Sequence, residues 1–214
     1  MSIAKEHALM WLDTETTGLN PHKDQLLEIG VIVTSMDGEE VIYQRSTVLY
    51  HEALTITQDM LAAVRMHMAN GLLDECLDYG KSTSHEDAYA RYYHELASLT
   101  DRYVLHPAGS NVQFDLAFVD AHAPGKYHHG GNSDRGFWEY LAHYRRFDLT
   151  ALRLLWQTAG VRYEPGIDTD HRVQTCLLRD LDEYRAMLEQ FRDAMAPAQM
   201  GETSRSGRSR SSPA

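Results

Sequence analysis

The most constraining feature of this chain is an apolar segment, residues 8–12, followed by two carboxylates only two residues apart, Asp13 and Glu15. Side chains alternate between the two faces of a strand, so residues i and i+2 point to the same side. We therefore expect a buried strand over residues 7–13, with both carboxylates side by side where it ends. Like charges held that close are unfavourable unless a proton or a cation lies between them. A divalent cation such as Mg²⁺ or Mn²⁺, which prefers oxygen ligands, would satisfy the pair.

The composition is that of one globular domain. With 214 residues, of which 43% are hydrophobic, the chain is long enough to bury its own core. Its formal net charge of −11 argues against a protein that grips long duplexes, and favours a short substrate in a small pocket. No apolar run reaches the roughly 18 residues of a membrane span. The N-terminal residues lack the apolar region of a signal peptide, so we expect a cytoplasmic protein with no membrane contact.

The hydrophobic pattern predicts an α/β domain over residues 1–196, followed by a disordered Ser/Arg/Gly tail over residues 197–214. Three strands are expected first, at residues 7–13, 25–35 and 41–49, with Asp37-Gly38 as a hairpin turn. The later elements are helices at 57–63 and 71–79, a helix capped by Ser84 and ending near Ser98, a strand at 103–109, a helix at 114–121, a loop at 122–135, a short strand at 145–148, a helix from Thr150 to Ala159, and a last helix at 171–195. The strands at 25–35 and 41–49 are rich in Ile and Val and are expected to be mostly buried.

Two further candidate catalytic residues lie at the boundaries between expected strands and helices. Asp115 follows the strand at 103–109, and His171 lies at the start of the last helix. Taken alone, Asp115 would be a helix N-terminal residue favoured by the helix dipole, and a lone histidine is more often structural than catalytic. Together with the first carboxylate pair, they form a recognisable set. The two cysteines, Cys76 and Cys176, lack CxxC spacing and are expected to be reduced thiols.

The run Asp13-Thr-Glu15-Thr-Thr-Gly-Leu after an apolar strand resembles the first motif of the DEDD 3′–5′ exonuclease superfamily. Asp115 and His171 match the second motif and the histidine of its DEDDh branch. The resemblance implies a ribonuclease H-like fold, a mixed five-stranded sheet flanked by helices. It also implies two Mg²⁺ or Mn²⁺ ions held by Asp13, Glu15 and Asp115, with His171 as the general base.

The chain departs from that pattern at the fourth carboxylate. The superfamily has an aspartate five residues after the histidine, and this chain has Cys176 there. A thiolate is a soft ligand that suits Mg²⁺ poorly. Asp180, one helical turn later on the same face, is the first candidate for a replacement ligand, and Asp168 and Asp170 are the others.

Three further segments resemble the oligoribonuclease branch, which trims very short RNAs: Val64-Arg-Met-His67-Met-Ala-Asn-Gly-Leu72, His143-Tyr144-Arg145-Arg-Phe-Asp148-Leu-Thr150-Ala-Leu152, and Leu19 after Thr17-Gly18. The resemblance implies that Leu19 wedges between two bases, which His67 and Tyr144 hold by stacking. Arg145 and Thr150 would close over the terminal phosphate. Asn111 would replace a serine contact to phosphate. Tyr144 would come from a partner subunit, so a homodimer is implied.

The leading hypothesis is a metal-dependent 3′–5′ exoribonuclease that degrades short single-stranded RNA, down to dinucleotides, to 5′ mononucleotides. One alternative is a proofreading-type DEDDh exonuclease acting on DNA. Another is a catalytically weakened protein that binds short nucleotides and lacks the fourth acid. A glycosidase-like pair formed by Asp13 and Glu15 would leave His171 and the Tyr144 segment unexplained.

Overall fold

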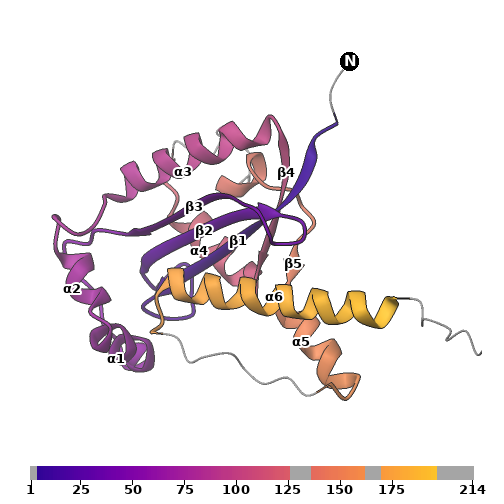
Figure 1. The fold of residues 1–214 in the computed structure, drawn as a ribbon. Coiled ribbons are helices and arrows are strands. Elements are labelled where there is room, and N and C mark those ends of the chain that lie inside the picture. The colour runs from indigo at the N-terminus through magenta and orange to yellow at the C-terminus, as the bar shows by residue number, and fades with distance from the viewer. Residues whose placement is uncertain (1–3, 126–135, 162–169, 197–214) are drawn as a thin grey trace, which may run out of the picture.

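The computed structural model describes residues 4–125, 136–161 and 170–196. The expected tail at 197–214 and most of the expected loop at 122–135 therefore lie outside the described residues, as does Asp168. The predicted fold class is confirmed, because a mixed five-stranded sheet with strand order β3-β2-β1-β4-β5 has helices on both faces (Figure 1). Within the described residues, no helix combines the length and the apolar character needed to cross a bilayer.

The central strand of the sheet carries the first carboxylate pair. The strands are β1 (Glu6–Thr16), β2 (Leu26–Ser35), β3 (Val41–Val48), β4 (Tyr103–Gly109) and β5 (Phe147–Asp148). β1 pairs antiparallel with β2 and parallel with β4, and it continues three residues beyond the expected end. Thr14 and Glu15 still pair with Ile29 and Glu28 of β2. The carboxylates thus lie within a paired strand, which fixes their common direction more firmly than a loop would.

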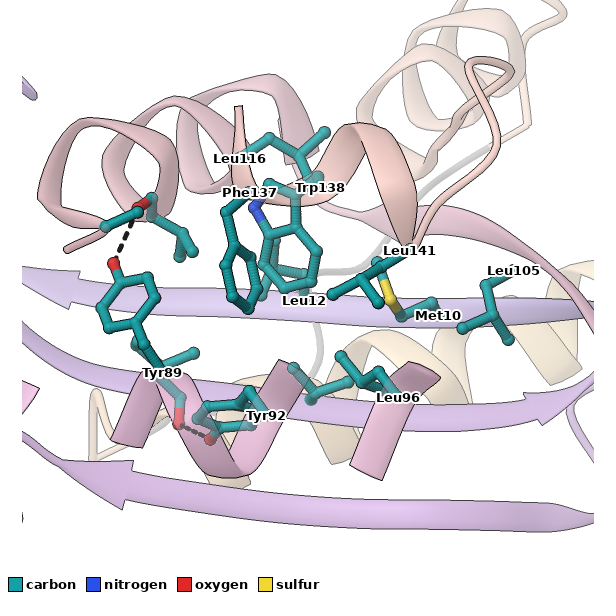
Figure 2. Close-up of a cluster of buried hydrophobic side chains, with 14 of the residues drawn as sticks. Met10, Leu12, Tyr89, Tyr92, Leu96, Leu105, Leu116, Phe137, Trp138 and Leu141 are labelled. Atoms are coloured by element: carbon teal, nitrogen blue, oxygen red, sulfur yellow. Dashed lines mark hydrogen bonds between the residues drawn. The ribbon is translucent and has the colours of Figure 1, made fainter. Parts of the chain in front are cut away.

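One face of the sheet is covered by α3 (His85–Thr100) and α4 (Val112–His122), together with a short 3-10 helix, η3 (Phe137–Tyr140). Met10 and Leu12 of β1 point into this layer, among the aromatic side chains drawn in Figure 2. Tyr89 and Tyr92 of α3 are fully buried there, and their hydroxyls donate to backbone carbonyl oxygens at 2.7 and 2.8 Å. Ser84 caps α3 by accepting a hydrogen bond from the backbone N–H of Asp87, as predicted.

The other face is covered by α5 (Leu149–Thr158) and by the long helix α6 (Val173–Met195), which crosses the sheet in Figure 1. Leu9 and Trp11 of β1 are buried in this layer, so Asp13 and Glu15 continue the same face. Gly30, which pairs with Asp13 across the strands, has no side chain to hold the helix away. A Cβ at Gly30 would lie 2.7 Å from side-chain atoms of both Val173 and Leu177. The glycine therefore permits α6 to lie close to the carboxylate pair.

A third, smaller layer lies beyond the end of the sheet. It consists of η1 (Gln58–Met60), α1 (Leu61–Ala69) and α2 (Leu72–Leu77), which pack on Leu27 of β2. The predicted helix at residues 57–63 is thus displaced toward the C-terminus. A tight turn at Gly38, with φ of +78°, joins β2 and β3 as expected.

Three further sequence expectations were wrong in detail. β3 is mostly half-buried or exposed, because it is an edge strand with a neighbour on one side only. The carboxylate of Asp148, and not the Thr150 hydroxyl, caps α5 by accepting from the backbone N–H of Thr150. His171 precedes α6, because its φ of +52° is not helical.

Replacing Gly30 with alanine should destabilise the fold and push α6 away from the sheet. Overpacking of this kind typically costs about 1–3 kcal/mol, and urea denaturation of Gly30→Ala would measure it. Gly125→Ala is the matched control, because an added Cβ there meets nothing within 4 Å. Equal stability of the two variants would contradict the close approach of α6 at Gly30.

Candidate active site

Three potential metal ligands gather where β1 meets the start of α6. They are Asp13, Glu15 and Cys176, and one ligand atom of each lies within 4.8 Å of the others. The structure shows one such group of three among its described residues. The Oδ2 atom of Asp13 is fully covered and has no hydrogen-bond partner within the protein. A buried carboxylate oxygen without a partner is costly, so this atom fits a site that a cation completes.

The electrostatics of the pair also favour a positive charge. Burial is the main cause that raises the pKa of Glu15, to about 8, and the carboxylates of Glu28 and Asp115 raise it further. Burial likewise raises the pKa of Asp13 well above its usual value, with Asp115 and Glu15 adding to the effect. Near neutral pH Glu15 therefore retains its proton to a large extent unless a cation replaces it.

Asp115 lies in the first turn of α4 and is held from the opposite side of β1. Its Oδ1 accepts hydrogen bonds from the backbone N–H and the hydroxyl of Thr14, at 3.0 and 2.8 Å. Burial raises the pKa of Asp115 to about 8, although the bonds from Thr14 oppose the shift. The structure thus brings the charge of Asp115 close enough to affect Asp13 and Glu15, while one of its oxygens is bound to Thr14.

The start of α6 is fixed to the sheet by one arginine. Arg172 donates to both oxygens of Glu28, at 2.9 and 3.0 Å, and also to Glu75 at 2.7 Å. The backbone N–H of Val173 donates to the same Glu28 carboxylate. Because Glu28 pairs with Glu15 across the strands, this ion pair places α6 beside the candidate ligands. Sequence reasoning missed Glu28 and Arg172, although a lone carboxylate in the apolar run 26–33 was a usable signal.

His171, the predicted base, is exposed on the segment that leads into α6. Asn70, which follows α1, donates its side-chain amide to the backbone carbonyls of Asp170 and His171, at 2.8 and 2.9 Å. These two bonds fix the backbone in front of the helix. The His171 side chain is therefore carried by a restrained segment between α1 and α6.

The fourth carboxylate remains the point of departure. Asp180 is 4% exposed, and its carboxylate accepts from Ser110, Arg153 and Arg179 at 2.5 to 3.1 Å. It is not part of the group formed with Asp13 and Glu15. Asp170 is exposed and accepts from the backbone N–H of Arg172. On the face of α6 that meets the pair, the side chain present is Cys176, which is 6% exposed.

The loop that follows β1 forms a hollow, which begins at Gly18, three residues after Glu15. Its volume is about 470 Å³, and its lining includes Gly18, Leu19, Pro21 and Met60. Leu19 is 84% exposed, the highest value among the exposed large hydrophobic side chains of the described residues. The predicted wedge is thus available at the surface.

His67 on α1 lies beneath this region and is only 1% exposed. Its Nε2 lies 3.2 Å from the backbone oxygen of Thr16 and 3.5 Å from Glu15, while Nδ1 is buried without a partner within the protein. Burial lowers the pKa of His67 to about 4, so its imidazole is neutral. The ring supports the strand that carries Glu15, and its face is covered in this structure.

The other predicted substrate contacts fall into two places. Asp148 accepts from the backbone N–H groups of both Asn111 and Thr150, which lie at the same end of the sheet as the carboxylates. Tyr144 is 75% exposed, and the guanidinium of Arg145 lies 5.5 Å from its ring centre. That segment is attached to the middle of β4, through the backbone bond from His143 to Leu105.

The stability of the metal-free protein should depend on pH through Glu15. A carboxyl whose pKa is higher in the folded chain binds its proton more tightly there, so its stabilising effect is lost as the pH rises from the unfolded pKa to the folded one. For Glu15 that range runs from 4.5 to about 8. With a chelator present, the free energy of unfolding of Glu15→Gln should decline less over this range than that of the wild type. Glu52→Gln, at an exposed position, is the control, and identical pH profiles for all three proteins would contradict the shift.

Comparison with known proteins places this geometry in a family. A model of the exonuclease family matches residues 10–84. The oligoribonuclease of Streptomyces avermitilis is 30% identical, covering 94% of this chain and 92% of that protein. The oligoribonuclease of Tropheryma whipplei is 29% identical over 86% of this chain and 92% of its own length. That of Baumannia cicadellinicola is 34% identical, over 75% and 78%.

Solved structures agree at the level of the fold. Exonuclease I of Methylocaldum szegediense has a TM-score of 0.59 at 15% identity, covering 86% of this chain. E. coli exonuclease I in complex with a 5cy-dT13 oligonucleotide has a TM-score of 0.61 at 14% identity, covering 88%. The chain spans about two fifths of the length of each, 41% and 42%. From the full-length similarity to its sequence relatives, the chain belongs to the oligoribonuclease family.

Proposed function

We propose that this protein is a metal-dependent 3′–5′ exoribonuclease that hydrolyses short oligoribonucleotides, down to dinucleotides, to 5′ mononucleotides. The observation that carries the proposal is the Asp13–Glu15 pair, with a covered Asp13 oxygen that has no partner within the protein, on the strand from which the chain continues into the hollow lined by Gly18 and Leu19. In a member of the oligoribonuclease family, this arrangement supports phosphodiester hydrolysis at the end of a short chain. The expected cytoplasmic location stays a prediction.

The carboxylates are suited to hold divalent cations. Asp13 and Glu15 would ligate the metal directly, and Asp115 would complete the negative charge around it. We keep the expectation of two ions, Mg²⁺ or Mn²⁺, as part of the proposal. A divalent cation supplies positive charge that makes water a better nucleophile and stabilises a leaving oxygen.

His171 is the proposed general base. Its side chain is exposed on the segment that leads into α6, and Asn70 restrains the backbone that carries it. A neutral imidazole can accept a proton from the attacking water near neutral pH. Leu19 would separate the two bases of a dinucleotide, while Asn111 and Thr150, held by Asp148, would contact phosphate.

The position of Tyr144 supports a homodimer. His143 is bonded to Leu105, which pairs with Ala8 of β1, five residues before Asp13. At a rise of roughly 3.3 Å per residue, that is about 16 Å along the sheet. The bond from His143 therefore attaches the segment that carries Tyr144 well before the carboxylates along the sheet. We propose that Tyr144 and Arg145 serve the site of the partner subunit.

A second function is kept because of one observation, the replacement of the fourth acid by Cys176. A site that still binds nucleotides but holds Mg²⁺ weakly would make the protein a short-nucleotide binder with little turnover. The proofreading-type DNA exonuclease draws support only from the fold shared with exonuclease I. Equal cleavage of long single-stranded DNA and of an RNA dinucleotide would favour that alternative.

Purified protein with Mn²⁺ should convert a 5′-labelled RNA dinucleotide to labelled mononucleotide. Asp13→Asn should lower kcat by more than about 100-fold. Mutating residues that hydrogen-bond to metal ligands typically lowers activity ~10–100-fold, and loss of a ligand itself should lower it more. Asp74→Asn, an exposed change on α2, is the control and should retain activity. An intact dinucleotide that nevertheless binds tightly to the wild type would establish the binding function instead.

Mixing two inactive variants should restore activity if the site is shared between subunits. Asp13→Asn destroys a chain's own site, and Tyr144→Ala removes the residue that we assign to the partner's site. A heterodimer of the two then has one complete site, so random reassortment should recover about a quarter of wild-type activity. The measurement is dinucleotide hydrolysis after the two variants are unfolded and refolded together. No recovery above the separate variants would contradict the shared site.

A further inference from the structure

Cys176 is buried and lies beside the two carboxylates, as a metal ligand would. Its Sγ belongs to the group in which donor atoms of Asp13 and Glu15 lie within 4.8 Å of it. Donor atoms around one tetrahedral metal stand roughly 3.5 Å apart, as metal–ligand distances of about 2.0–2.3 Å imply. Small side-chain rotations would therefore bring the three donors around one ion.

The packing of α6 explains why the thiol is there. Val173 and Leu177 lie over Gly30, the residue opposite Asp13, and Arg172 is bonded to Glu28. These contacts leave Cys176 facing the carboxylates. Asp180 cannot take its place without giving up its bonds to Ser110, Arg153 and Arg179.

From these contacts we propose that Cys176 is itself a metal ligand, and that Asp13, Glu15 and Cys176 form a mixed carboxylate–thiolate centre that selects a thiophilic divalent cation, with Zn²⁺ or Co²⁺ favoured over Mg²⁺. The inference rests on the proposed metal site, and for the ion held by these three residues it replaces the expectation of Mg²⁺ or Mn²⁺ with a thiophilic cation. A thiolate binds Zn²⁺ strongly, whereas Mg²⁺ requires oxygen ligands in near-octahedral geometry. Binding forms a metal–sulfur bond and releases the thiol proton to solvent.

Cobalt provides a direct probe of the sulfur bond. Metal-free wild-type protein titrated with Co²⁺ should develop the near-ultraviolet charge-transfer absorption of a thiolate–cobalt bond. Cys176→Ser should lose this band while Cys76→Ser keeps it. Cys76 is the matched control because it is buried on α2, and serine retains the hydrogen bond that its Sγ donates to Leu27. Circular dichroism would verify that both variants are folded.

Affinity measurements complete the test. By calorimetry, Cys176→Asp should reduce the preference for Zn²⁺ over Mg²⁺ by at least about tenfold, in the range seen when groups around a metal are altered. A wild type that binds Co²⁺ without the band, or a band lost with Cys76 instead, overturns the inference.

Failure of the proposed function has a different signature. Suppose that neither the wild type nor Cys176→Asp cleaves a dinucleotide in Zn²⁺, Mn²⁺ or Mg²⁺, but the cobalt band depends on Cys176. The thiolate ligand is then supported and the proposed nuclease activity is contradicted. If the wild type cleaves the dinucleotide and no band forms, the nuclease stands and the thiolate ligand falls.

Discussion

The site depends on the enclosure of β1. This strand has hydrogen-bonded neighbours on both edges and packed helices on both faces. Its side chains therefore have fixed directions, and the two carboxylates at its end point to the same face. Burial with like charges raises the pKa of Asp13 and Glu15, and an Asp13 oxygen is left without a partner in the protein. A cation bound between these carboxylates would offset their repulsion and so stabilise the folded chain.

The position of α6 adds a third side chain to the two carboxylates of β1. A missing side chain at Gly30 and a forked ion pair between Arg172 and Glu28 bring the helix against the sheet next to the carboxylates. The same contacts decide that Cys176 faces the site and that Asp180 joins Arg153 and Arg179 behind it. The grouping of two carboxylates with one thiol follows from packing as much as from the residues themselves.

Patterns of neighbouring residues predicted an element correctly where the element depends only on residues close to it in the sequence. The strand Tyr103–Gly109 and the Ser84 cap are confirmed, because alternation and capping depend on neighbours in the sequence. The patterns failed where a distant segment decided. β1 extends to Thr16 because β2 pairs with it there, and Asp148 caps α5 because β5 pairs with β4 and fixes its position.

The sequence by itself determined that Asp13 and Glu15 share a face, because strand geometry has a period of two. Together with the motifs of a family, it also identified the chemistry. The tertiary structure decided which residue of α6 meets that pair, because the position of a helix on a sheet is set by side chains from several segments, here Gly30, Glu28 and Arg172. It also attached the segment before Tyr144 to the middle of β4, because the partner of a loop is set by strand pairing and cannot be read from spacing along the sequence.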